Sequence, residues 1–118
     1  SNGLDNTRVN QFLISGDNLF SATETGVFSW QEKNTSWELT VAVSEGVYSI
    51  AHNRENPKIL AAGSKGFVLI SHDSGQSWKK IKTEYDWHYP FLLFNYAEDV
   101  KLMLGSIESG AFIMKIDE

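Results

Sequence analysis

The chain has 118 residues, no cysteine and a formal net charge of −5 at pH 7. Its length allows one domain at most, and 42% apolar residues are too many for a disordered chain. The lack of cysteine excludes disulfide bonds and thiolate metal sites. No apolar run reaches the ~18 residues that a membrane span needs. The excess of acidic over basic residues argues against nucleic acid as a partner.

The first part of the chain predicts four short strands. The opening Ser1-Asn2-Gly3 is typical of a cleaved tag, so we expect residues 1–8 to be a flexible lead-in. Short runs rich in aromatic and β-branched residues then follow, bounded by Gly, Asn, Asp and Ser, which is a strand pattern. These strands are expected near 9–15, 18–24, 26–31 and 36–41.

The same order of elements recurs twice. A second unit predicts strands near 46–52, 58–64, 66–72 and 77–82, and a third predicts strands near 89–96, 100–107 and 110–116. The third unit lacks a fourth strand, from which we expect either strand donation or truncation. Several of these runs are apolar at consecutive positions, which indicates sheets that are covered on both faces.

The three units share a fixed period. Leu19–Thr23, Leu60–Ser64 and Leu102–Ser106 match one another, and their leading leucines lie 41 and 42 residues apart. A period near 42 with about four strands per unit is typical of the blades of a β-propeller. We therefore predict an all-β fold of three four-stranded antiparallel blades, the third incomplete, with one propeller segment over 9–118 divided into units of about 9–41, 46–82 and 89–116. A β-sandwich with accidental periodicity is the alternative.

Closure of such a fold poses a problem. Propellers close with ~4–8 blades, so three units leave two exposed apolar flanks. We expect closure either by oligomerisation, with a homodimer giving six blades, or within a larger parent propeller.

A motif lies between the third and fourth strands of the second unit. Its fixed positions are Ser71, Asp73, Gly75, Ser77 and Trp78. An Asp in a turn accepts hydrogen bonds from the amides that follow, a glycine supplies a positive φ, and a tryptophan buries a large ring. The pattern resembles the Asp-box, also called the BNR repeat. We expect Asp73 to have a structural role and not to act as a catalytic or calcium-binding carboxylate.

The first unit carries a degenerate copy of this motif. Its corresponding positions are Glu32, Asn34, Ser36 and Trp37, and Trp30 replaces the leading serine. Asparagine tolerates a positive φ, so we expect a turn with Asn34 in that conformation. Glutamate is one methylene longer than aspartate and is expected to cap this turn less well.

Residues 47–64 are similar to a stretch found in sortilin-type and xyloglucanase-type propellers, and photosystem assembly factor propellers carry similar blades. The resemblance extends from about residue 9 to residue 116. It implies a propeller architecture with the Asp-box at the periphery of a blade. Because most Asp-box proteins are extracytoplasmic, it also favours a secreted or periplasmic location.

The sequence offers no catalytic set. Sialidases with Asp-boxes use three arginines and a tyrosine nucleophile, whereas this chain has only Arg8 and Arg54. Its three histidines fall in separate units without the spacing of a zinc site, and no phosphate-binding glycine loop is present, so we expect no metal and no cofactor.

The segment between the second and third units is rich in aromatic residues. Tyr85, Asp86, Trp87, His88 and Tyr89 could stack on a sugar ring or anchor a protein, although the aromatic rings could instead plug the central channel. We expect a non-catalytic binding or assembly module that recognises a protein or glycan through its blade-connecting loops. The expected face bears residues 83–90 and the loops near 23–26, 63–66 and 106–110. The alternative is a fragment or subunit of a sialidase-like or xyloglucanase-like glycoside hydrolase with catalytic residues elsewhere.

Overall fold

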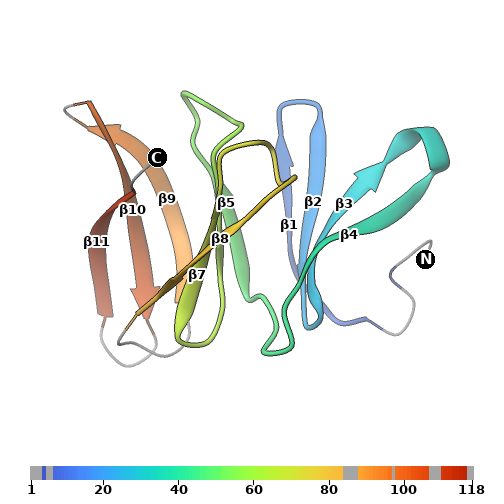
Figure 1. The fold of residues 1–118 in the computed structure, drawn as a ribbon, viewed down its shortest axis with the longest axis horizontal. Helices are drawn as coiled ribbons and strands as arrows, with labels where there is room; N and C mark the ends of the chain where they lie inside the picture. The colour runs from blue at the N-terminus through green and yellow to red at the C-terminus, as the bar shows by residue number, and fades with distance from the viewer. Residues whose placement is uncertain (1–3, 5–6, 84–87, 97, 107–109, 117–118) are drawn as a thin grey trace.

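The computed structural model describes residues 4, 7–83, 88–96, 98–106 and 110–116, which form three antiparallel sheets (Figure 1). We call these sheets blades 1, 2 and 3. Blade 1 contains β1 (Val9–Ser15), β2 (Asn18–Thr23), β3 (Gly26–Gln31) and β4 (Ser36–Ala42), with a 3-10 turn at Glu32–Asn34. Blade 2 contains β5 (Ser49–His52), β6 (Leu60–Gly63), β7 (Phe67–Ser71) and β8 (Lys79–Lys82). Blade 3 contains β9 (His88–Tyr96), β10 (Asp99–Ser106) and β11 (Gly110–Ile116).

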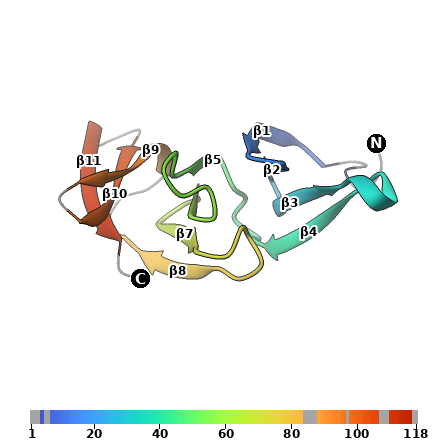
Figure 2. The same cartoon turned by 90° about the horizontal axis from the view of Figure 1, so that it is seen from above.

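Within each blade the strands are paired in chain order. The orders are β1-β2-β3-β4, β5-β6-β7-β8 and β9-β10-β11. The three sheets stand side by side in a row, as the view from above shows (Figure 2). The predicted all-β fold with a 42-residue rhythm is therefore confirmed. The strands of blade 2 are shorter than predicted, because the segments before β5 and β6 form turns instead of continuing the pairing.

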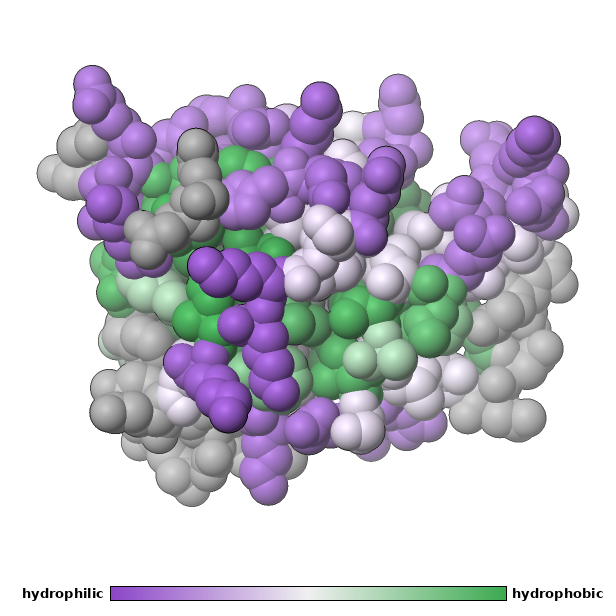
Figure 3. All heavy atoms as spheres, in the orientation of Figure 1, coloured by the Kyte–Doolittle hydropathy of each residue, from purple (hydrophilic) through white to green (hydrophobic). Residues whose placement is uncertain are grey.

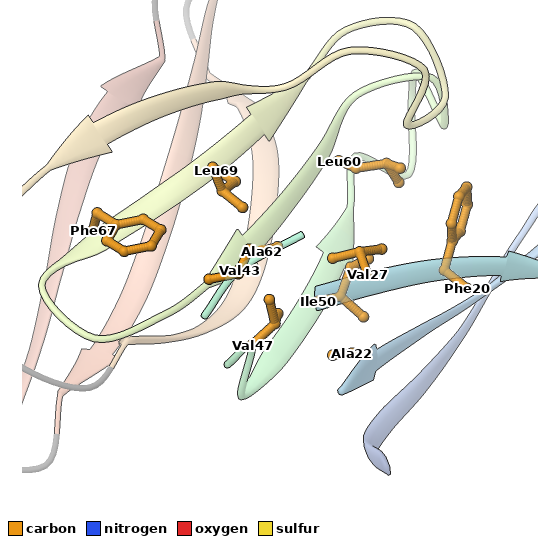
Figure 4. Close-up of a cluster of buried hydrophobic side chains, with 10 residues drawn as sticks. All are labelled: Phe20, Ala22, Val27, Val43, Val47, Ile50, Leu60, Ala62, Phe67 and Leu69. Carbon is orange, nitrogen blue, oxygen red and sulfur yellow. The ribbon is translucent and has the colours of Figure 1, made fainter. Parts of the chain in front are cut away.

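Two apolar cores fill the spaces between neighbouring blades. The core between blades 1 and 2 contains Phe20, Ala22, Val27, Val43, Val47, Ile50, Leu60, Ala62, Phe67 and Leu69 (Figure 4). The core between blades 2 and 3 contains Ile59, Ala61, Val68, Ile70, Leu93, Leu102, Leu104 and Ile116. Successive residues of β7, such as Val68 and Leu69, enter different cores because strand side chains alternate between the two faces. This alternation explains why the strands of blade 2 are apolar at consecutive positions.

The first strands of the blades are also joined by polar side chains. The amide of Gln11 in β1 accepts from the backbone N–H of Ile50 at 3.0 Å and donates to its carbonyl at 3.1 Å, as a neighbouring strand would. His52 Nδ1 lies 2.8 Å from Ser15 Oγ. The buried Asn53 donates to the Asn95 side chain at 2.7 Å, which joins β5 to β9. Amide pairs of this kind satisfy buried polar groups while fixing the blades in register.

The two outermost blade faces remain open. Phe12 and Ile14 of β1 are 56% and 73% exposed, and they alternate with Gln11 and Leu13, which contact blade 2. On blade 3, Ile113 is 56% exposed, whereas the adjacent Met114 packs against the second core. The space-filling view shows apolar residues in a band across the middle of the molecule, with hydrophilic residues above and below it (Figure 3). Within the described residues the sheets do not close into a ring.

Candidate functional site

The turn between β7 and β8 contains the residues that resemble an Asp-box, 71–78, and we call it the Asp-box turn. It is held by its own polar side chains. Ser77 donates to Asp73 through its hydroxyl at 2.5 Å and through its backbone N–H at 2.9 Å. Ser71 Oγ donates to Asp73 at 2.8 Å and accepts from the N–H of Gly75 at 2.8 Å. Both carboxylate oxygens of Asp73 are therefore engaged within the turn.

These hydrogen bonds favour the charged form of Asp73. The hydroxyl and backbone N–H of Ser77, together with the Ser71 hydroxyl, lower the pKa of Asp73 from 3.8 to about 2. A general acid would need the opposite shift, since it must hold a proton near neutral pH. The electrostatics thus favour a turn-stabilising role for this carboxylate.

The turn also packs against blade 1. Gly75 has a φ of 89°, and a Cβ at this position would lie 3.0 Å from Cε1 of Phe20. The indole N–H of Trp78 donates to the Gly75 carbonyl at 3.0 Å, and the Trp78 ring packs against the core between blades 1 and 2. The left-handed backbone therefore favours glycine at this position, and a Cβ would in addition require the Phe20 ring to shift by a few tenths of an ångström.

The corresponding turn of blade 1 has a different construction. Glu32–Asn34 form a 3-10 turn, and Thr35, with a φ of 46°, adopts the left-handed conformation. The expected turn is present, but Asn34 is not among the residues with positive φ, so the conformation expected of Asn34 itself is wrong. The positive φ therefore lies one residue later, at Thr35, which ends the 3-10 turn. The N–H of Thr35 donates to the Glu32 carbonyl at 3.1 Å.

Aromatic packing replaces the polar network in this turn. The rings of Trp30 and Trp37 meet edge to face at 5.5 Å, and Trp37 also lies 5.9 Å from Phe12. Trp30 occupies the position of Ser71 in the Asp-box, so the hydroxyl that organises the other turn is missing here. The N-cap residue Gln31 makes no capping hydrogen bond with its side chain.

The aromatic segment that sequence analysis assigned to partner binding is largely outside the described residues. Tyr85, Asp86 and Trp87 fall in the part that the structure does not describe. The backbones of His88 and Tyr89 belong to β9, where they pair with Ser106 and Gly105. Their role in binding stays a prediction.

A hollow that sequence analysis did not identify lies at the edge of the blades where the connecting loops gather. The β2–β3 turn, the β6–β7 turn and the connection between blades 1 and 2 share this edge, the lower one in Figure 1. The hollow has a volume of about 450 Å³ and is lined by Arg8, Asn10, Glu24, Glu45, Gly46 and Tyr48. We call it the loop hollow. Sequence analysis placed the loop near 23–26, which contains Glu24, on the binding face, but it did not single out Arg8, Glu45 or Tyr48.

Hydrogen bonds to the backbone hold several walls of the loop hollow. Asn10 donates to the Val47 carbonyl at 2.7 Å, and the Tyr48 hydroxyl donates to the Glu45 carbonyl at 3.0 Å. A carboxylate oxygen of Glu24 accepts from the backbone N–H of Arg8 at 3.2 Å. The pKa of Glu45 is lowered, first by its own backbone N–H and then by the Ser44 hydroxyl. The loop hollow therefore presents one cation and two carboxylates on an ordered frame.

The described residues offer no metal centre and no membrane-spanning element. Within them, no cluster of three or more His, Asp or Glu side chains is placed to hold a metal ion. Nor does this part of the chain include a helix of the length and apolarity needed to cross a bilayer.

Comparison with solved structures identifies the architecture. An ancestral GH74 enzyme superposes with a TM-score of 0.64 at 17% identity, covering 94% of this chain and 18% of that chain. U3-55K and the RRP9 WD40 repeats each superpose with a TM-score of 0.65 at 11% identity. Each match covers 96% of this chain, and it covers 40% of the U3-55K chain and 39% of the RRP9 chain. The fold is that of β-propeller blades. This chain spans less than half the length of each of these structures, and their identities establish the fold alone.

Sequence comparisons add no closer relationship. No protein-family model matches the chain, and no curated protein sequence matches it.

Proposed function

We propose that the chain is a non-catalytic binding or assembly module of Asp-box β-propeller type, which recognises a protein or glycan through its blade-connecting loops. The loop hollow carries this proposal. Its lining residues are polar and come from the start of β1, the β2–β3 turn and the connection to blade 2. Three separate segments thus converge on one site, which is the usual construction of a recognition surface on a rigid scaffold.

The chemistry of the loop hollow suits recognition better than catalysis. Arg8, Glu24 and Glu45 can form charge-assisted hydrogen bonds, and Tyr48 adds a ring with a polar hydroxyl. Asp73, the carboxylate of the motif, is engaged in its turn and takes no part in this hollow. We propose that Tyr85, Asp86, Trp87, His88 and Tyr89 take part in the same recognition.

The open blade faces support the larger assembly that this function requires. Phe12 and Ile14 on blade 1 and Ile113 on blade 3 expose apolar surface at both ends of the row. Stacking of a further blade on each end would bury this surface, and each Å² of buried apolar surface stabilises the assembly by about 25 cal/mol. We propose that further blades of a longer chain or a second copy provide this cover, around one propeller segment comprising residues 9–118.

The experiment measures binding of the full chain to arrays of glycans and peptides, followed by titration of the bound class. We expect Arg8→Ala, Glu24→Gln and Tyr48→Ala each to weaken binding roughly tenfold, as loss of a charge-assisted hydrogen bond or an aromatic contact does. Glu32→Gln, an exposed carboxylate in the blade 1 turn, is the matched control and leaves binding unchanged. Equal binding by all four variants would reject the loop hollow as the site.

A second candidate function is supported by one structural neighbour, the ancestral GH74 enzyme. In this alternative the chain is part of a sialidase-like or xyloglucanase-like glycoside hydrolase with catalytic residues in other blades. Glycosidase assays on the chain and on any longer form of it distinguish the two candidates. Turnover by the longer form alone favours the enzyme, and tight binding without turnover by either form favours the binding module.

A further inference from the structure

A second cavity lies between blade 1 and the Asp-box turn of blade 2. It has a volume of about 450 Å³, and we call it the interblade groove. The β1–β2 turn and the Asp-box turn share the edge of the blades opposite the loop hollow, the upper edge in Figure 1. The polar residues that line the groove are Asn18, Ser29, Gln31, Thr40, Ser74 and Gln76.

The interblade groove contains no titratable residue. Its lining consists of three carboxamides, three hydroxyls and a few apolar residues, among them Phe20 and Trp30. A charged ligand would find no opposite charge among the lining residues. The loop hollow, with one arginine and two glutamates, differs in this respect. The groove therefore favours an uncharged ligand.

The polar groups of the groove provide donors and acceptors together. Gln31 donates to Ser29 Oγ at 2.7 Å, which orients its amide, and Thr40 donates to the Val27 carbonyl at 3.1 Å. Asn18 and Gln76 are exposed, and a carboxamide offers both a donor and an acceptor end. A sugar hydroxyl also donates and accepts, so several such groups can be satisfied by one saccharide.

One wall of the groove is rigid before any ligand binds. Ser74, Gly75 and Gln76 belong to the turn that Asp73 holds, and Gly75 packs against Phe20. A preformed wall lowers the entropy cost of binding. The volume also falls within the ~300–1,000 Å³ of typical small-molecule sites.

We infer that the interblade groove binds a neutral oligosaccharide, with the Asn18, Gln31 and Gln76 carboxamides as hydrogen-bonding partners. The Asp-box turn would then form one wall of a ligand site besides linking β7 to β8. This inference is independent of the function proposed for the loop hollow, since the two sites share no lining residue.

The test is a titration of the ¹⁵N-labelled 118-residue chain, followed by NMR. The probes are the neutral tetrasaccharides cellotetraose and maltotetraose, and tetragalacturonic acid is the charged counterpart. We expect at least one neutral probe to shift the side-chain amide signals of Asn18, Gln31 and Gln76, and the acidic probe to leave them in place. Asn18→Ala and Gln76→Ala should each weaken binding roughly three- to tenfold, as expected for one hydrogen bond.

Three controls make the result decisive. Asn34→Ala removes an exposed carboxamide outside the groove and should leave the affinity unchanged. Thermal melting verifies that Asn18→Ala and Gln76→Ala remain folded, which their exposed positions predict. A capped tetra-alanine peptide tests whether the groove instead binds an uncharged peptide.

The inference is overturned by any of four outcomes. The neutral saccharides could leave the three amide signals unshifted at millimolar concentration, the peptide alone could shift them, or Gln76→Ala and Asn18→Ala could bind as the parent chain does. Saccharide shifts confined to Arg8, Glu24 and Tyr48 would likewise overturn it while supporting the loop hollow.

Discussion

The turns that join the third and fourth strands of blades 1 and 2 occupy equivalent places and are stabilised differently. In blade 2, Asp73 collects hydrogen bonds from Ser71 and Ser77, and Gly75 brings the turn against Phe20 of blade 1. In blade 1, residues 32–35 are all exposed, and the paired rings of Trp30 and Trp37 lie beside them.

The difference follows from what each turn must contact. The Asp-box turn lies between two blades, so its backbone must take one shape that fits the neighbouring core, and several short hydrogen bonds impose that shape. The blade 1 turn has no blade against it among the described residues, and a 3-10 turn beside an aromatic pair is sufficient there. Among the described residues, the turn that packs on a neighbouring blade carries the full motif, and the exposed turn carries the degenerate copy.

The largest effect is expected from Gly75→Ala. The new Cβ would meet Phe20 at 3.0 Å in a backbone with a φ of 89°, so we expect a loss of about 2–3 kcal/mol in the free energy of unfolding. Gly16→Ala is the control, because its φ is 61° and no atom lies within 4 Å of the added Cβ. Urea unfolding should show a smaller loss of about 1 kcal/mol for the control, due to the backbone alone. Equal losses would show that packing against Phe20 does not matter.

A smaller effect is expected from Trp37→Leu in the blade 1 turn. This substitution removes the ring contacts with Trp30 at 5.5 Å and Phe12 at 5.9 Å, and we expect a loss of about 1–2 kcal/mol. Urea unfolding followed by circular dichroism measures it. A loss below about 0.5 kcal/mol would contradict the view that aromatic packing replaces the polar network.

The pH dependence of stability should separate the two turns further. Because the folded-state pKa of Asp73 lies at about 2 and its ordinary value is 3.8, its stabilising effect is complete above the ordinary value and is lost as the pH falls through about 2. Asp73→Asn should therefore reduce the slope of stability against pH between these values. Parallel curves for the two proteins, from urea midpoints at each pH, would refute the linkage.

The smallest effect is expected from Glu32→Asp. It restores the Asp-box carboxylate to blade 1, where Ser36 stands at the position of Ser77. Trp30 replaces the other serine, Ser71, so the hydroxyl that links the carboxylate to the N–H of the glycine position is missing. We expect the free energy of unfolding to stay within about 0.5 kcal/mol of the parent. A clear stabilisation in urea unfolding would mean that the aspartate alone nucleates the hydrogen-bonded turn.

The sequence predicted most strands of blades 1 and 3 to within one or two residues, because their apolar runs are bounded by turn-forming residues. It failed at Asn34, since propensity favours asparagine at positive φ while the 3-10 turn transfers that conformation to Thr35. The loop near 23–26 was assigned to the binding face, but the sequence could not predict that Arg8 and Glu45 join Glu24 there, because these residues lie far apart in the chain. The same is true of Asn18 and Gln76 in the interblade groove.

The amino-acid sequence by itself determined the repeat of sheet units and the composition of the Asp-box, because strand formation and turn capping depend on residues that are close in the chain. Only the tertiary structure decided which faces meet, which polar side chains line the two cavities, and that the Gly75 turn packs on Phe20. The physical reason is that these features arise from the packing of one blade on the next, and local sequence patterns carry no record of that contact.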